Sequence, residues 1–407
     1  MKSIFVSIIA IAVLFALVPV NARANEGGRK IVVFQAGLNE TAKDEIVSRA
    51  GGSKLKNLDL IGARAVWVPS RAAVEKLEAN PAVVRVDDDV EVFALSHKGG
   101  GGSTQPAQVL PWGIDRIDAE LVWPSGNTAN PIKVGIVDTG ISKDHPDLKA
   151  NIKGGVNTIR PGKSWNDDNG HGSHVAGTVG ALNNTIGVVG AGPAVDLYAI
   201  KVLNAGGSGY LSDVIEGIEW GVVNNMKVLN MSLGASSDVQ SFHDAITAAY
   251  NAGVVLVAAA GNSGSSVIFP AAYSEVIAVS ATDASNTLAS FSSRGPEVDL
   301  AAPGVSIYST YKGTGYATLS GTSMATPHVT GAAALVLNTP TDTTFATSTV
   351  ATSTVLTCVS VYDVNCNSKW DPREVQTKLQ ATATDLGGVG FDNLFGWGLV
   401  NAFSAVQ

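Results

Sequence analysis

Short apolar segments alternate with segments of helical spacing over most of the chain from Pro111 onward. Five of the apolar segments are rich in Val, Ile, Leu and Ala: PIKVGIVDTG, DLYAIKVLN, MKVLNMSLG, GVVLVAAAGN and SEVIAVSATD. Segments of this length and composition are typical of strands that are buried on both faces. Residues 212–225 and 238–253, which lie between them, have the spacing of helices. We therefore predict an α/β fold of three layers, in which helices flank both faces of a mainly parallel central sheet.

A second, smaller unit is predicted between residues 25 and 95. The pattern indicates a strand at 29–35, a helix at 41–51, one or two strands at 58–69, a helix at 70–80 and a pair of strands at 82–95. This order is typical of a small ferredoxin-like α+β domain. Residues 96–110 contain four consecutive glycines and no apolar periodicity, so we interpret them as a linker before a main domain at residues 111–407.

Composition narrows the class of protein. Charged residues make up 15% of the 407 residues and apolar residues 45%, with 44 glycines, which favours a compact fold with a large core and many turns. The net charge is −8, and residues 96–407 alone carry 15 Lys and Arg against 24 Asp and Glu. This acidity argues against a nucleic-acid partner and is compatible with bound cations.

The N-terminus has the pattern of a secretory signal. Lys2 precedes an uncharged, mostly apolar stretch from Ile4 to Val20, and Ala22 and Ala24 place small residues where a signal peptidase cuts. A membrane anchor is the alternative, because this stretch reaches the lower limit of a membrane span. The small residues favour cleavage, so we expect residues 1–24 to be removed and the mature protein to be secreted, extracellular and free of the membrane.

Residues 338–371 interrupt the main pattern. Residues 338–355 are rich in Thr and Ser without helical periodicity, which predicts an inserted surface loop or ribbon. In an exported protein, Cys358 and Cys366 are expected to form a disulfide; two buried free thiols are the alternative.

Three motifs carry residues that suit nucleophilic chemistry. Asp138 lies in IVDTG, His171 in NGHGSHVAGT and Ser323 in GTSMATPH. A serine hydroxyl is a weak nucleophile unless an imidazole accepts its proton, and a carboxylate must hold that imidazole in the right tautomer. Taken one at a time, the three residues would instead be a turn residue, a donor at a helix start and an N-cap. Together they predict a serine hydrolase.

Six segments stand in order between about Gln108 and Leu335: WGIDRI, VGIVDTGISKDHPDL, NGHGSHVAGTVGALNN, NMSLG, VAAAGNSG and LSGTSMATPHVTGAAAL. This region resembles the subtilisin-like serine proteases. The resemblance implies a subtilisin-like fold and a serine endopeptidase acting on polypeptides, with Ser323 as nucleophile, His171 as base and Asp138 orienting the base. It also implies that Asn262 and the Ser323 backbone N–H bind the oxyanion. Residues 25–95 would be a propeptide that assists folding, inhibits the enzyme and is cut off by it.

The resemblance assigns substrate-binding residues as well. Two edge segments would hold an extended substrate strand, namely Gly207, Ser208 and Gly209, and Ser232, Leu233 and Gly234. Ala259, Ala260 and Gly261 would form a wall of the S1 pocket, and Ile268 would lie at its base, where many relatives have a small residue. A branched side chain there predicts a shortened pocket that rejects bulky aromatic P1 residues. The alternative is that Ile268 turns into the core.

Calcium is the expected cofactor, at two sites. By resemblance, the first site takes side-chain oxygens and carbonyls from Gln108, Asp147, Leu182, Asn184, Ile186 and Val188; a hydrogen-bonded loop is the alternative. The second follows from the spacing of residues 363–374, which resembles an EF-hand loop. Its ligands would be Asp363, Asn365, Asn367, Lys369 through its carbonyl, Asp371 and Glu374. Ser368 replaces the usual glycine, and a polar loop that caps the following helix is the alternative.

Other functions are less consistent with these residues. His171 and His174 could suggest zinc, but no third ligand follows at metal spacing. Lipases and esterases usually carry Gly-x-Ser-x-Gly, which Gly321–Ala325 does not match, and their chain order of catalytic residues differs. A catalytically inactive, protease-derived binding protein remains the alternative, and we expect a monomer.

Overall fold

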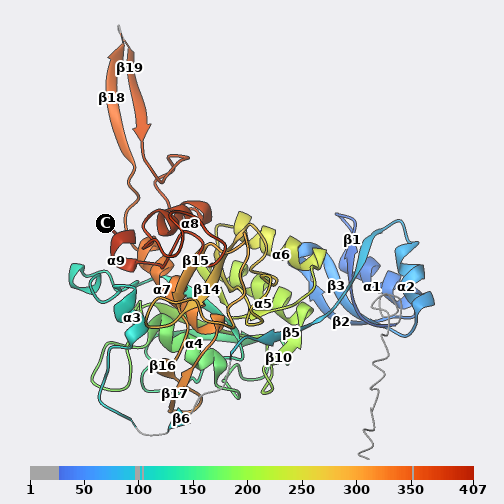
Figure 1. Cartoon of the computed structure of the whole chain (residues 1–407). Helices are drawn as coiled ribbons and strands as arrows, with labels where there is room; N and C mark the ends of the chain where they lie inside the picture. Colours follow the sequence, from blue (N-terminus) through green and yellow to red (C-terminus); the bar gives the residue numbers. More distant parts are fainter. Residues whose placement is uncertain (1–26, 97–100, 103–104, 351–352) are drawn as a thin grey trace, which may run out of the picture.

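The computed structural model describes residues 27–96, 101–102, 105–350 and 353–407, so the predicted signal at 1–24 lies outside the described residues. The described chain consists of an N-terminal module, a large main body and a hairpin that projects from that body (Figure 1). Within these ranges no helix combines the length and the apolar character needed to cross a membrane.

The N-terminal module, residues 27–95, is a four-stranded antiparallel sheet with two helices. Its elements are β1 (Gly28–Phe34), α1 (Glu40–Arg49), β2 (Ser53–Leu58), the 3₁₀ turn η2 (Asp59–Ile61), β3 (Ala63–Val68), α2 (Arg71–Glu78) and β4 (Val83–Asp88). The strand order is β2-β3-β1-β4. Apolar residues of both helices, such as Val47 and Leu77, pack with Val32 of β1 to form a separate small core. Strand β2 lies before the segment that the sequence indicated. It was not recognised because it is polar and only its last side chain, Leu58, is buried.

The main body contains a parallel sheet of seven strands, ordered β15-β14-β13-β11-β7-β9-β8. The strands are β7 (Lys133–Asp138), β8 (Ile152–Asn157), β9 (Asp196–Lys201), β11 (Val228–Met231), β13 (Val255–Ala259), β14 (Val276–Thr282) and β15 (Leu300–Pro303). The five predicted apolar segments are the five central strands. The two edge strands escaped prediction because β8 contains two glycines and β15 has only four residues ending in a proline.

Helices cover both faces of this sheet, which confirms the predicted three layers (Figure 1). Ile136 of β7 packs into one core with α4 (His171–Gly180) and α7 (Thr322–Leu337). The next residue, Val137, packs into the other core with α5 (Leu211–Val223) and α6 (Gln240–Asn251). Neighbouring side chains of one strand are thus buried on opposite faces. The remaining helical segments are α3 (Trp112–Arg116), η3 (Trp123–Ser125), α8 (Pro372–Ala381) and α9 (Ala402–Ala405).

Two small sheets and a hairpin complete the structure. Strand β5 (Glu91–Ala94) leaves the N-terminal module and lies between β10 (Ser208–Tyr210) and β12 (Leu233–Gly234) of the main body. Strands β16 (Ile307–Thr310), β17 (Tyr316–Leu319) and β6 (Gly101–Gly102) form another sheet. The inserted segment forms the projecting hairpin of β18 (Thr344–Val350) and β19 (Ser353–Val359) (Figure 1). At its base Cys358 and Cys366 form the disulfide, with Cα atoms 6.2 Å apart.

Candidate active site

Asp138 and His171 meet at the carboxyl edge of the central sheet. Asp138 is the last residue of β7 and His171 the first of α4. His171 Nδ1 lies 2.8 Å from Oδ1 and 2.9 Å from Oδ2 of Asp138, and both side chains are buried. This is the edge at which ligands of open α/β sheets bind. A carboxylate in this position fixes which imidazole nitrogen carries the proton.

Ser323 is buried in the first turn of α7, which brings its backbone N–H to a helix N-terminus. Its hydroxyl donates to the Ser232 carbonyl at 2.9 Å. Among the described residues, His171 Nε2 has no hydrogen-bond partner. Of the three predicted catalytic residues, Asp138 and His171 are therefore in direct contact, while the Ser323 hydroxyl is hydrogen-bonded to a backbone carbonyl.

Pro327 explains a second link between Ser232 and Ser323. A residue four positions after Ser323 would normally donate its N–H to the Ser323 carbonyl, but Pro327 has no N–H. The Ser232 hydroxyl supplies the missing donor at 2.9 Å. Ser232 and Ser323 are thus joined by two hydrogen bonds, which ties a predicted edge segment to the predicted nucleophile.

The Asn262 amide is oriented by its neighbours and contacts the N-terminal segment. Its Oδ1 accepts hydrogen bonds from the N–H (2.9 Å) and hydroxyl (2.8 Å) of Thr322. Its Nδ2 donates to the carbonyl of Leu95 at 2.7 Å. Gly321 packs closely on the same peptide: a Cβ added there would lie 2.5 Å from the Leu95 carbonyl oxygen, so a larger residue would force the loop before Ser323 away from it.

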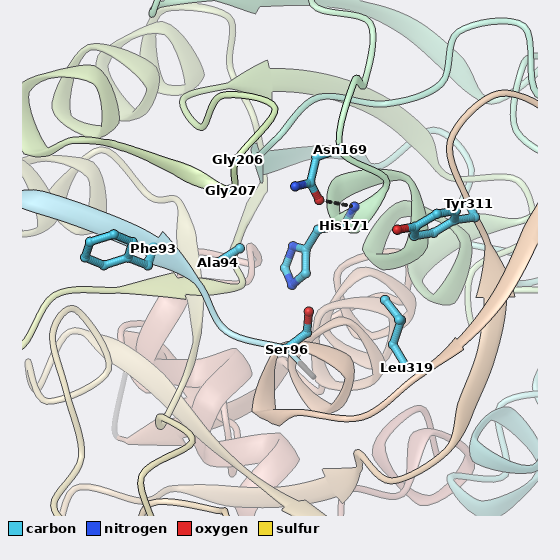
Figure 2. A pocket seen from close by; sticks show the side chains of 9 residues that line it. All are labelled: Phe93, Ala94, Ser96, Asn169, His171, Gly206, Gly207, Tyr311 and Leu319. Carbon is cyan, nitrogen blue, oxygen red and sulfur yellow. Dashed lines mark hydrogen bonds between the residues drawn. The ribbon is translucent and has the colours of Figure 1, made fainter. Parts of the chain in front are cut away.

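Strand β5 runs through the cleft between the two predicted substrate-binding segments. It pairs antiparallel with β10 on one side and with β12 on the other. The Ala94 N–H donates to Gly207 at 2.9 Å, and the Leu95 N–H to Ser232 at 3.4 Å. A cleft of about 160 Å³ is lined by Ala94 and Ser96, together with His171, and Figure 2 shows the Ser96 side chain pointing toward the imidazole. The extended segment of β5 thus brings the Leu95–Ser96 bond to the site.

Comparison with known proteins agrees with this geometry. Residues 129–398 match the Subtilase family. This chain belongs to that family.

The chain is similar along most of its length to named proteases. It is 44% identical to an alkaline protease of Shouchella clausii over 82% of this chain and 77% of that protein. It is 37% identical to subtilisin E of Bacillus subtilis (strain 168) over 100% of this chain and 99% of that protein. Subtilisin Savinase of Lederbergia lenta is 45% identical over 74% of this chain and 100% of that protein. The chain is therefore a subtilisin-like serine endopeptidase.

The residues predicted for the S1 pocket of this subtilase lie together. The Ile268 N–H donates to the Ala260 carbonyl at 3.1 Å, which joins the expected base to the expected wall. The Ile268 side chain packs against the backbones of Gly234 and Gly261, and it is partly exposed. Ile268 is not one of the buried residues of either core of the main body.

The side chains predicted for the first calcium site also come together. Asn184 Nδ2 lies 2.7 Å from Asp147 Oδ1, and the Gln108 Oε1 accepts the N–H of Asn184 at 2.6 Å. The other Asp147 oxygen accepts the N–H of Val188 at 2.9 Å. Asp147 is fully buried, and the described groups that donate to its carboxylate, the third being the Tyr316 hydroxyl, are all uncharged. Burial raises its pKa. Leu182 and Ile186 belong to the same loop, where the N–H of Leu182 bonds to the Asp147 carbonyl.

The EF-hand-like segment closes on itself through turn hydrogen bonds. Asp363 accepts the N–H groups of Asn367 (3.0 Å) and Ser368 (2.8 Å). Ser368 has φ of 58°, the left-handed conformation for which an EF-hand loop uses glycine. Both Glu374 oxygens accept backbone N–H groups, those of Val364 and Asp371.

The remaining predicted ligands of this segment lie in the same turn. Asp371 contacts the side-chain amides of Asn365 and Asn367, and the Lys369 N–H donates to Asn367. Across the described part of the chain, no three His, Cys, Asp or Glu side chains form a metal-binding cluster.

Two of the histidines without a predicted role, His174 and His328, lie in the interior of the main body. His174 and His328 are fully buried, and burial lowers their pKa values to about 3 and about 4. Both are therefore neutral at physiological pH. Sequence reasoning missed Asp167, a buried carboxylate shortly before α4. An acidic residue just before a helix is an N-terminal signal that could have identified it.

Proposed function

We propose that this subtilase is a secreted endopeptidase with an Asp138–His171–Ser323 triad, made as a precursor that cuts its own Leu95–Ser96 bond. One observation carries the proposal. The Leu95 carbonyl accepts a hydrogen bond from Asn262 while strand β5 lies between β10 and β12, beside the Asp138–His171 pair. A peptide held by its backbone with its carbonyl on a preorganised donor is the arrangement that acyl transfer needs.

The reaction follows from the residues at that bond. The Ser323 hydroxyl turns from the Ser232 carbonyl toward His171 Nε2, which accepts its proton as the oxygen bonds to the carbonyl carbon. The carbonyl electron pair moves onto oxygen, where the Asn262 amide and the Ser323 N–H stabilise the charge. His171 then protonates the departing nitrogen of Ser96 as the C–N bond breaks. Water repeats the sequence on the ester and releases the Leu95 carboxylate.

The N-terminal module would remain as an inhibitor after the cut. Asp89 accepts the N–H and the hydroxyl of Ser212 at 2.8 Å, at the start of α5. Asp87 accepts the N–H of Ser241 at 3.1 Å, at the start of α6. These carboxylates satisfy N–H groups that a helix start leaves free, and they face the positive end of the helix dipole. Lys56 adds an ion pair with Asp213 at 2.6 Å.

We further propose calcium at the loop that contains Asp147 and Asn184. The donor set fits, because a buried carboxylate whose described donors are uncharged and several neutral oxygens suit a hard cation. Gln108 and Asn184 would add side-chain oxygens, and Leu182, Ile186 and Val188 would add carbonyls. Calcium would supply the positive charge that balances the buried Asp147 carboxylate.

The second calcium proposal concerns residues 363–374. The left-handed Ser368 and the oxygen side chains at alternate positions support it. Both Glu374 oxygens bind backbone N–H groups in this structure. Calcium binding would therefore have to replace these hydrogen bonds with bonds to the ion.

Hydrolysis of casein by the refolded chain tests the main proposal. The wild type should hydrolyse casein, react with a fluorophosphonate and yield a mature chain that begins at Ser96. Ser323→Ala should do none of these, because it lacks the nucleophile. Wild-type protein that neither hydrolyses casein nor reacts would instead favour an inactive binding protein. A Ser323→Ala variant that matures alone at the same bond would show that another protease makes the cut.

A further inference from the structure

The side chain of Asp167 is buried between the end of β7, which carries Asp138, and the start of α4, which carries His171. Its carboxylate accepts five hydrogen bonds. Its Oδ1 accepts the hydroxyl of Thr139 and the N–H groups of Asn169 and Gly170, each at 2.9 Å. Its Oδ2 accepts the N–H of Ser173 at 2.9 Å and the hydroxyl of Ser173 at 2.6 Å. Only an acceptor-only side chain satisfies all five donors, since an amide would turn N–H bonds toward some of them.

The bonded donors lie on both sides of the Asp138–His171 contact. Thr139 directly follows Asp138 at the end of β7, and Asn169, Gly170 and Ser173 surround His171 at the start of α4. The N-cap position of α4 is Gly170, which has no capping side chain, so Asp167 accepts two of the N–H groups at this helix start, those of Gly170 and Ser173.

The Thr139 hydroxyl connects Asp167 to the backbone of α4. It donates to Asp167 and accepts the N–H of Gly172 at 2.9 Å. Gly172 packs on β7 so closely that an added Cβ would lie 3.1 Å from the Asp138 Cβ. The residues that follow Asp138 and His171 in the sequence are thus joined through one oxygen atom, and Asp167 holds that oxygen.

We propose that Asp167, acting through Thr139, is a positioning residue that fixes His171 against Asp138. This inference rests on the proposed triad. The carboxylate touches neither substrate nor reacting atoms. Its role is to hold the imidazole where Nε2 faces the cleft, and a displacement of about 1 Å at such a site can cost about 100-fold in rate.

The test is Asp167→Asn in the full chain, with Asp168→Asn as the matched control. Asp168 is exposed and pairs with Lys201, which also donates to the Thr139 carbonyl at 2.6 Å. The Asp168 change therefore removes a charge at the neighbouring position but leaves all five hydrogen bonds of the Asp167 carboxylate and the Thr139 hydroxyl in place. On a peptide substrate, Asp167→Asn should lower kcat about 10- to 100-fold and leave KM within about threefold. Asp167→Asn should lower kcat/KM at every pH. The pH at which kcat/KM reaches half its maximum on the acid side should shift no further than it does in Asp168→Asn.

Thr139 provides the second arm if Asp167→Asn does not fold. Thr139→Val keeps the shape but removes the hydroxyl, and it should lower kcat at unchanged KM; Thr139→Ser should restore kcat. Equal kcat values for Asp167→Asn and Asp168→Asn, or for Thr139→Val and wild type, would overturn the inference. A fall explained only by a shifted pH midpoint would also overturn it, because that is an electrostatic effect. Ser323→Ala is assayed in parallel, since activity in that variant contradicts the triad itself rather than the role of Asp167.

Discussion

At the scale of single residues, Ile268 is expected to affect substrate specificity, because many relatives have a small residue at this position. Its side chain packs on Gly234 of one predicted edge segment and on Gly261 of the predicted pocket wall. A misfit of one methylene in such a pocket is worth about 1–3 kcal/mol, so substrates with Phe at P1 should be poor and those with Leu or Ala favoured. Ile268→Gly should raise kcat/KM for P1 Phe at least tenfold relative to P1 Ala. Peptides that differ only at P1 provide the measurement.

Leu95, the proposed P1 residue of self-cleavage, is consistent with a pocket of medium depth. The neighbouring Val267→Ala change serves as a control, because it removes apolar volume next to Ile268 without altering the pocket base. A wild type that already prefers Phe, with no change in Ile268→Gly, would mean that the side chain does not limit the pocket.

Asp299 makes stability depend on pH. It accepts the Ala278 N–H and the side-chain amides of Gln376 and Gln380, and burial raises its pKa to about 6. A raised pKa in the folded state means that Asp299 favours folding below about pH 4 and that this contribution is lost as the pH rises through about 6. Asp299→Asn should abolish this loss, on the order of 1–3 kcal/mol, because Asn stays neutral.

Thermal unfolding from pH 4 to pH 8 measures this effect, in a Ser323→Ala background that prevents autolysis. Relative to its own Tm at pH 4, the Asn variant should lose less at pH 8 than the parent does. Parallel pH curves for the two proteins would contradict the raised pKa.

At the scale of elements, the starts of α5 and α6 depend on carboxylates from another part of the chain. At the start of α5, Asp213 accepts the N–H of the N-cap residue Tyr210, and Asp89 of the N-terminal module accepts that of Ser212. At the start of α6 the N-cap residue Val239 makes no side-chain cap, and Asp87 of the module accepts the N–H of Ser241. Asp89→Ala should therefore loosen the cut module, because it leaves Ser212 without its partner at a cost of about 1–3 kcal/mol. We expect the delay between self-cleavage and full activity to shorten about tenfold or more.

Gel analysis of cleavage and peptide hydrolysis, followed together on the refolded chain, give this delay. Asp88→Ala is the matched control, since Asp88 pairs with Lys30 inside the module and its side chain is about half exposed. Equal delays in the two variants would show that capping of α5 does not hold the module in place.

These elements also show what a sequence can reveal. The central strands were predictable because both faces are buried and the residues are uniformly apolar, whereas Gly154 and Gly155 hide the edge strand β8. The triad motifs were recognisable because each stands in a distinctive local pattern. The roles of Asp87 and Asp89 were not, because three consecutive aspartates look like a solvated charged segment until a distant helix start is placed against them. Asp167 was missed for the same reason: its donors come from two separate segments.

At the scale of the whole molecule, calcium is expected to contribute to stability. An ion that binds only the folded state stabilises it by mass action, so chelation should lower the Tm. Glu374→Ala should reduce the bound calcium by one ion and leave the site at Asp147 and Asn184 filled. Asp147→Asn should remove the other ion and lower the Tm further. Metal analysis of dialysed protein counts the ions, and equal counts in wild type and Glu374→Ala would contradict the EF-hand-like site.

The passage of β5 through the cleft has a kinetic consequence. In the proposed self-cleavage, the bond to be cut belongs to the chain that cuts it, so the rate of the first cleavage should not depend on protein concentration. Dilution, which slows any encounter between separate molecules, leaves this step unchanged. The cut also requires β10, β12 and α7 to be in place around the bond, so a chain that has not folded cannot make it. Cleavage of a molecule therefore marks that this molecule has folded, and it can occur only once in each molecule.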